Sequence, residues 1–363
     1  MSTAAPAPGL IRVKLLLKSH RGKETENLLR RFPGHLPIWG RCQFILDYDA
    51  HDYDWLVVYD DLPPVGGERF TLWEETLACP RSHTLLITTE PSTIKTYGSR
   101  FLAQFGHVLT SQEPWVIKHP GAIFSQPALL WFYGRTDERG NYDRMISHPP
   151  EEKTAMISTV CSSKQQTHTL HQARYDFTQK LRAAIPEMDV FGHGVRNIND
   201  KAESLDSYRY HIAVENHVYR HHWTEKLSDS YLGLTLPFYH GCPNVEDYFP
   251  EDSFISIDIH RFEESAERIL QAIRDHEYER RLPAIREARR RVLEEYGLFA
   301  VISRIIGEKH NPPVRKMAGE QILSRHALRK SSIGNALTYA LEKLKNRSRH
   351  RWQDFRKHGS APS

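Results

Sequence analysis

The amino-acid sequence predicts an α/β protein made of two doubly wound domains that face a cleft, followed by a helical tail. Short β-type runs alternate with helical patterns in both halves of the chain, and a polar stretch with Gly and a Pro pair, residues 135–154, separates the halves. Strands separated by helices form parallel sheets, which bind ligands at the carboxyl ends of their strands. We expect one domain over 1–150, a second over 151–307 and a tail over 308–363.

The first half contains apolar runs of strand length, bounded by turn residues. The β-type runs are residues 12–17, 42–47, 54–61, 84–90, 107–111 and 128–134. A helical pattern at 93–104 follows the fourth run. These elements together predict one parallel sheet.

The second half repeats the alternation. Its predicted strands are residues 155–162, 189–194, 208–216, 235–241 and 254–259, and its predicted helices are 169–185 and 224–234. Residues 262–307 are helical and heavily charged, and Arg290 and Arg291 stand one turn before Glu294 and Glu295. Such pairs stabilise a solvated helix face.

Composition narrows the class of protein. The 363 residues are 39% hydrophobic and 26% charged, which is typical of globular domains. No run approaches the roughly 20 apolar residues that span a bilayer, and the N-terminus lacks the pattern of a signal peptide. The four cysteines are scattered. We therefore expect a cytoplasmic protein with reduced thiols.

Positive charge is concentrated in the tail. From residue 308 onward there are 13 Lys and Arg against 4 Asp and Glu, although the whole chain carries only +4. The body before the tail is therefore net acidic. A nucleic-acid-binding body would instead combine basic with aromatic residues, so we expect no nucleic acid as a partner.

The segment 208–257 carries the strongest chemical signal. A predicted strand ends at Glu215 and Asn216, and Thr224 is a competent N-cap for the helix that begins with Glu225 and Lys226. A cation in the first turn of a helix is unfavourable unless an anion such as a diphosphate binds there. The alternative is an exposed lysine beside a capped helix.

The wider pattern resembles the donor-binding signature of glycosyltransferase family 10, the α-1,3/1,4-fucosyltransferases, in its bacterial form without a membrane anchor. The residues that carry the resemblance are Glu215, Asn216, Thr224, Glu225, Lys226, Pro237, Tyr239, Gly241, Pro243, Phe249, Pro250, Ser253 and Phe254. The family implies a GT-B fold with two Rossmann-like domains, of which the first faces the acceptor and the second binds the donor.

Further positions match the family outside this segment. Arg174 stands where the family has a phosphate-binding arginine, and Gly192, Gly194 and Asn197 fall on its glycine-rich turn. Glu90 follows a predicted strand where the family has a general base. A surface or capping carboxylate is the alternative interpretation of Glu90.

The resemblance implies inverting transfer of L-fucose from GDP-β-L-fucose to a hydroxyl group of a glycan or a lipid-linked glycan. Glu90 would remove the proton of the attacking hydroxyl. Arg174 and Lys226 would stabilise the departing diphosphate without a metal. Glu225 would accept hydrogen bonds from ribose or fucose hydroxyls, and Asn216 would orient the donor.

This sequence departs from the family pattern beside the donor site. Val214 and His222 replace the usual Phe and Tyr, and Trp223 follows His222. A different GDP-deoxysugar donor therefore stays open. A non-catalytic binding protein, associated with a membrane or with nucleic acid, is the alternative from another class.

Three other features of the sequence allow more than one interpretation. The Asp-x-Asp triplets of 47–54 resemble a metal–diphosphate motif, with a solvated loop as the alternative. His217 and His221 have the helical spacing of a zinc site, but no glutamate lies between them. In the tail, residues 329–351 form a basic amphipathic helix, which favours peripheral binding to an anionic membrane or packing on the body.

Overall fold

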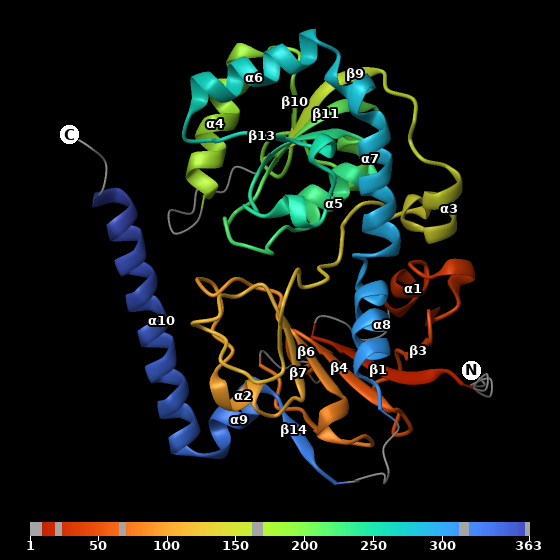
Figure 1. Ribbon diagram of the computed structural model, residues 1–363, viewed down its shortest axis with the longest axis vertical. Helices are drawn as coiled ribbons and strands as arrows, with labels where there is room; N and C mark the ends of the chain where they lie inside the picture. Colours follow the sequence, from red (N-terminus) through yellow and green to blue (C-terminus); the bar gives the residue numbers. More distant parts are fainter. Residues whose placement is uncertain (1–8, 19–23, 65–69, 162–169, 312–318, 360–363) are drawn as a thin grey trace. The chain divides into compact units, whose positions relative to one another are not determined.

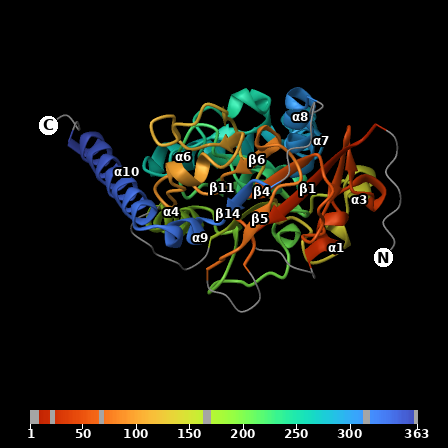
Figure 2. The same cartoon turned by 90° about the horizontal axis from the view of Figure 1, so that it is seen from below.

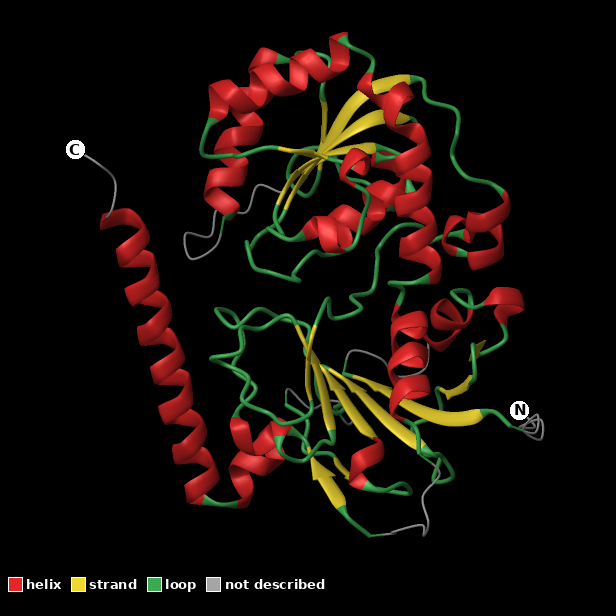
Figure 3. Cartoon of the chain, in the orientation of Figure 1, coloured by secondary structure: helices red, strands yellow, loops and turns green. Residues whose placement is uncertain are grey.

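The chain forms two compact α/β units. The computed structural model describes residues 9–18, 24–64, 70–161, 170–311 and 319–359. The first unit comprises residues 1–26, 37–127 and 302–363, and the second comprises 27–36 and 128–301. Figure 1 follows the chain through its elements, and Figure 3 separates strands from helices.

A seven-stranded sheet forms the centre of the first unit, in the order β2-β3-β1-β4-β6-β7-β8. All neighbours pair in parallel except β2 and β3. Its strands are β1 (Ile11–Leu17), β2 (Ile38–Trp39), β3 (Cys42–Ile45), β4 (Trp55–Tyr59), β6 (Thr84–Ile87), β7 (His107–Thr110) and β8 (Ala122–Phe124). The β1, β4 and β6 side chains are almost all buried, as expected for a parallel sheet covered on both faces.

The chain returns to this unit after the second one. Helix α8 (Leu298–Lys309) leads back, and β14 (Gln321–Leu323) pairs antiparallel with β5 (Glu74–Thr76). Helices α9 (Arg325–Ser331) and α10 (Ile333–Gly359) follow, as Figure 2 shows from below. Helix α2 (Ser99–Leu102) also belongs to this unit, and α1 (Glu24–Leu29) spans the boundary between the residue ranges of the two units. No helix of the described residues combines the length and the apolar character needed to cross a membrane.

The second unit is built on a five-stranded parallel sheet in the order β10-β9-β11-β12-β13. Its strands are β9 (Ala155–Val160), β10 (Asp189–Phe191), β11 (Tyr208–Val214), β12 (Leu236–His240) and β13 (Ile255–Ser256). Its helices are α3 (Tyr142–Ser147), α4 (His171–Ala184), α5 (Glu225–Leu232), α6 (Phe262–Arg274) and α7 (Glu277–Glu294). The two parallel sheets agree with the pair of doubly wound domains that the sequence predicts.

Several short 3-10 helices lie between these elements. They are η1 (Pro33–His35), η2 (Arg81–His83), η3 (Glu138–Gly140), η4 (Lys201–Ser204), η5 (Val245–Asp247) and η6 (Glu251–Ser253). The element η4 precedes β11 and contributes to the candidate site described below.

The structure corrects three predicted elements. The helix predicted at 93–104 is reduced to α2 (Ser99–Leu102), because Gly98 has a φ of +91° that a helix cannot continue through. Residues 128–134 form no strand. The predicted connection at 135–154 contains η3 and α3 and belongs to the second unit. Of the predicted elements, residues 162 and 169 lie outside the described part of the chain.

The division into units also differs from the predicted boundaries. The second unit begins at residue 128 rather than 151, and the tail from 308 onward is part of the first unit. The β5–β14 pair explains why the tail belongs there, because it ties the residues after α8 to the first unit.

Candidate functional site

A pocket in the second unit brings together cations from three separate elements. Its walls are the carboxyl-terminal parts of β9 and β11, one residue of α4, the element η4 and the first turns of α5. The cations that line it are Arg174, Lys201 and Lys226. We call this feature the cation pocket. It lies where parallel sheets bind ligands, at the carboxyl ends of the strands.

Arg174 reaches the pocket from a buried position on α4. Its Nη1 donates to Asn216 Oδ1 over 2.9 Å. Its Nε is buried without a hydrogen-bond partner among the described residues. The sequence prediction placed Arg174 and Asn216 at the same site, and the structure does bring them together. A buried guanidinium with an unused donor is suited to bind an anion.

Glu215 holds the first turn of α5 in place. One carboxylate oxygen accepts from Thr224 N over 2.8 Å and the other from Thr224 Oγ1 over 2.6 Å. Thr224 in turn caps α5, with its Oγ1 accepting from Lys226 N at 3.3 Å. The Glu215 side chain is buried, so it positions the capped turn. The sequence resemblance placed Glu215 among the donor-binding residues.

Gly241 is required beside Glu215. A Cβ added at Gly241 would lie 2.4 Å from Tyr239 Oη and 2.5 Å from Glu215 Cγ. Both contacts are shorter than real Cβ atoms show. The glycine of the sequence signature therefore has a packing reason, which is to admit the carboxylate that holds Thr224.

The ammonium of Lys226 is paired with two carboxylates. Its Nζ lies 2.8 Å from Glu225 Oε1 and 3.7 Å from Glu215 Oε2. Burial alone would lower the pKa of Lys226, but Glu225 and Glu215 raise it above its ordinary value. Burial would likewise raise the pKa of Glu225, and Lys226 outweighs this and lowers it to about 2. Burial raises the pKa of Glu215. Lys226 is therefore a fixed positive charge.

The glycine-rich turn after β10 has the backbone that the sequence predicts. Gly192 has a φ of +132° and Gly194 a φ of +82°, which other residues rarely adopt. Gly192 N donates to Arg196 O over 2.8 Å and so closes the turn, which Asn197 follows. None of Gly192, Gly194 and Asn197 lines the cation pocket.

The positions that depart from the family pattern are buried. Trp223 packs its ring against Tyr248, Phe249 and Tyr296, with centroids 5.0 to 5.8 Å apart. Burial lowers the pKa of His222 to about 4, so this imidazole is neutral. Val214 ends β11 and lines the cation pocket.

Sequence reasoning missed two residues of the pocket, Lys201 and Asp229. Asp229 is buried, and its Oδ1 accepts from Phe132 N at 2.9 Å and from Tyr133 N at 3.1 Å. Its Oδ2 has no hydrogen-bond partner among the described residues, and burial raises its pKa to about 7. Asp200 and Glu203 have the spacing of a capping box, so the sequence does carry a local signal for the start of η4 at Lys201.

Glu90 lies in the first unit, just beyond the end of β6. Its side chain is exposed, and its backbone carbonyl accepts from Gln112 Nε2 over 2.7 Å. The same amide nitrogen donates to Lys95 O at 2.9 Å, so Gln112 holds the loop at two points. Glu90 therefore follows the carboxyl end of a parallel strand, as the sequence predicts.

The structure shows the conformation and contacts of the two motifs that could have bound a metal. The segment from His217 to His221 is not helical, and His221 has a φ of +63°, so the helical spacing of a zinc site does not apply there. In the Asp-x-Asp stretch, Asp54 Oδ2 accepts from Arg12 N and Asp52 pairs with the Arg12 side chain. Both aspartates are thus used within the first unit.

One group of side chains in the described part of the chain could hold a metal ion. His240, Asp258 and His260 have ligand atoms within 4.8 Å of one another. His240 Nδ1 lies 3.1 Å from Ile257 O. None of the three lines the cation pocket.

Comparisons with known proteins match the part of the chain that contains this site. Residues 150–281 match the model of the C-terminal domain of glycosyltransferase family 10 (fucosyltransferase). The chain is 34% identical over 74 residues to the alpha-(1,3)-fucosyltransferase FucT of Helicobacter pylori, which covers 20% of this chain and 16% of that protein. It is 29% identical over 139 residues to a 4-galactosyl-N-acetylglucosaminide 3-alpha-L-fucosyltransferase of Gorilla gorilla gorilla, 36% of each chain.

These matches span about a sixth to a third of the curated relatives' length. A crystal structure of an alpha1,3-fucosyltransferase is 15% identical, with a TM-score of 0.47 over 78% of this chain and 83% of that one. The matched segment contains β9 to β13 and every residue that lines the cation pocket. Residues 150–281 are therefore a C-terminal domain of glycosyltransferase family 10.

Proposed function

We propose that this protein is an inverting glycosyltransferase that moves L-fucose from GDP-β-L-fucose to a hydroxyl group of a glycan acceptor, in α-1,3 or α-1,4 linkage. The observation that carries the proposal is the cation pocket, in which Arg174 and Lys226 line one cavity beside the capped start of α5. The curated relatives that match part of this chain are named as fucosyltransferases.

The diphosphate of the donor is the group that fits this pocket. Lys226 is held as a cation at the N-terminus of α5, where the helix dipole also favours negative charge. Arg174 offers its unused Nε. As the bond from the sugar to the diphosphate breaks, negative charge grows on the phosphate oxygens, and these fixed cations stabilise it. Side-chain cations thereby perform the task that a metal performs elsewhere, so transfer requires no metal.

Glu90 is the proposed general base. A sugar hydroxyl is a poor nucleophile, so a carboxylate accepts its proton as the new bond forms at the anomeric carbon. Attack on the face opposite the leaving diphosphate inverts the configuration, from a β-linked donor to an α-linked product. Glu225 and Asn216 are proposed to contact and orient the donor.

The outward face of α10 supports a second proposal, peripheral binding to an anionic membrane surface where a lipid-linked acceptor would lie. Ile333, Leu337, Leu341 and Leu344 are 59 to 81% exposed. The opposite face is polar and packs on the first unit, since Glu342 accepts from Ser99 N over 2.9 Å and Arg349 lies over the Trp115 ring. A helix that turns its apolar face away from its own unit fits a lipid interface.

A screen of nucleotide sugars tests the main proposal. Thermal unfolding is followed with GDP-fucose, GDP-mannose and UDP-glucose, and the product formed on a glycan array is then analysed by NMR. We expect the largest stabilisation from GDP-fucose and an α-anomeric product. A larger stabilisation by GDP-mannose would replace fucose as the transferred sugar, and no stabilisation by either GDP-sugar would support a non-catalytic protein.

A further inference from the structure

The cation pocket contains a third cation that lies outside the sequence signature. Lys201 begins η4, lines the same pocket as Arg174 and Lys226, and is half-buried. No hydrogen bond or ion pair within 4 Å joins its ammonium to another described residue. Burial lowers the pKa of Lys201, and the neighbouring Lys226 and Arg174 charges lower it further, against Asp229 and Glu225. Its charge is thus close to those of the two signature cations.

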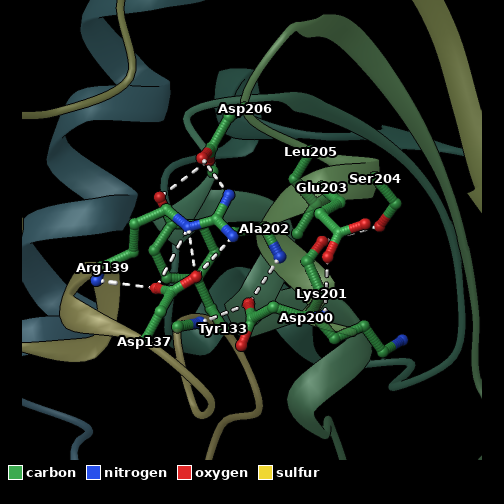
Figure 4. Close-up of polar contacts among 12 residues, drawn as sticks. Tyr133, Asp137, Arg139, Asp200, Lys201, Ala202, Glu203, Ser204, Leu205 and Asp206 are labelled. Atoms are coloured by element: carbon green, nitrogen blue, oxygen red, sulfur yellow. Dashed lines mark hydrogen bonds and ion pairs between the residues drawn. The ribbon is translucent and has the colours of Figure 1, made fainter. Parts of the chain in front are cut away.

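The backbone of Lys201 is held rigidly. Asp200 caps η4 by accepting from Ala202 N over 2.9 Å, and Glu203 completes the capping box. The two Asp200 oxygens also accept from Gly134 N at 2.8 Å and from Thr136 N at 3.0 Å, which ties η4 to the start of the second unit. Figure 4 shows the contact between Asp200 and Ala202, with the Lys201 side chain leaving η4 away from the Arg139–Asp206 cluster.

The three cations of the pocket differ in the groups that neutralise their charge. Lys226 is already paired with Glu225 and Glu215, and Arg174 with the neutral Asn216. The acid that lines the pocket with Lys201 is Asp229, which burial keeps partly protonated near neutral pH. His211, in the same wall, stays neutral, because burial and Lys201 lower its pKa to about 3. Unlike Lys226, Lys201 therefore has no carboxylate within ion-pair distance among the described residues.

We propose that Lys201 is a third phosphate-binding cation of this pocket, which contacts the diphosphate of the nucleotide donor from η4 together with Arg174 of α4 and Lys226 of α5. This rests on the proposed function for the identity of the ligand as a nucleoside diphosphate. Three cations from three rigid elements hold a diphosphate in one orientation, which sets the direction in which it departs.

Calorimetric titration of the full chain with GDP, guanosine and inorganic pyrophosphate tests the proposal. Lys201→Met should weaken GDP and pyrophosphate binding by about 10-fold or more, since a hydrogen bond to a charged group is lost. Guanosine affinity should be unchanged, and Lys201→Arg should restore most of the loss. The control is Lys180→Met, which removes the same charge from an exposed position on α4. Equal thermal unfolding of all variants shows that η4 is intact.

The outcomes separate this inference from the proposed function. If the wild-type chain and Lys201→Met bind GDP equally, the role of Lys201 is refuted while the donor site stands. If the wild-type chain binds pyrophosphate in a Lys201-dependent way but not GDP, the phosphate role holds and the guanine nucleotide is refuted. If the wild-type chain binds neither, both are refuted.

Discussion

Removing the Glu215 carboxylate should loosen the start of α5 before it affects any other part of the second unit. Glu215 is 1% exposed and accepts from both polar atoms of Thr224, at 2.8 and 2.6 Å. The same carboxylate lies 3.7 Å from the Lys226 ammonium. Glu215→Ala would leave Thr224 N–H without its acceptor, and Lys226 with only Glu225 as counter-charge.

The magnitude follows from these contacts. Each hydrogen bond to an ionised group contributes about 1.5–3 kcal/mol, and removal of one partner of a buried ion pair typically costs about 3–5 kcal/mol. The burial that raises the pKa of Glu215 offsets part of this gain. We therefore expect Glu215→Ala to lower the free energy of opening α5 by about 3–5 kcal/mol. Glu215→Gln, which keeps an acceptor for Thr224 N, should cost less.

Amide hydrogen exchange read by mass spectrometry on peptides covering α5 and β11 gives this local free energy in a two-unit chain. The control is Glu279→Ala, since Glu279 pairs with Arg209 at a side-chain exposure of 49% and such pairs contribute about 0–1 kcal/mol. GDP affinity should fall with the protection of α5. If Glu215→Ala and Glu279→Ala lose the same protection, the positioning role assigned to Glu215 is wrong.

The remaining predictions concern catalysis, metal, membrane and pH. Glu90→Gln should keep its calorimetric affinity for GDP and lose nearly all transfer, and near-normal turnover would exclude Glu90 as the base. Transfer should continue in excess EDTA, whereas a strict Mn²⁺ requirement would revive the Asp-x-Asp interpretation. Leu337→Glu with Leu341→Glu should abolish co-sedimentation with anionic vesicles, and unchanged binding would refute a membrane role for α10. Because the folded pKa of Asp229 is raised to about 7, its contribution to stability is present at low pH and is lost as pH rises toward neutrality. Asp229→Asn should flatten the decline of the thermal midpoint between about pH 4 and 7, and an unaltered decline would exclude Asp229 as its source.

The sheets could be predicted because each strand carries its own signal. The continuous apolar runs of β1, β4 and β6 reflect burial on both faces of a parallel sheet, and burial of this kind needs no knowledge of distant partners. The N-cap at Thr224 could also be predicted from neighbouring residues alone. A capping side chain accepts a hydrogen bond from a backbone N–H in the first turn of its own helix.

The misread elements depend on contacts that sequence patterns do not carry. Residues 128–134 are apolar like a strand, but the backbone N–H groups of Phe132 and Tyr133 donate to Asp229, about a hundred positions away. The return of the tail to the first unit depends on a strand pair between Glu74–Thr76 and Gln321–Leu323. The sequence of one strand of this pair carries no signal that identifies the other strand.

Some residues of the candidate site could likewise be predicted from the sequence, and others could not. Arg174, Asn216, Thr224 and Lys226 could be named in advance, because they match positions of the family that the sequence resembles. The buried role of Glu215 as the acceptor for Thr224 became visible only in the structure. Lys201 follows a local capping signal, Asp200 with Glu203, but that signal says nothing of a ligand, and Lys201 joins the site because η4 folds against the ends of β9 and β11.

A crystal structure of the chain with GDP is the most direct test of the central claim, that the cation pocket binds the diphosphate of a nucleotide donor. We expect phosphate oxygens of the bound GDP at about 2.7–3.2 Å from the Arg174 guanidinium and the Lys226 ammonium. A GDP molecule bound elsewhere in the second unit, or phosphates that contact neither side chain, would contradict it.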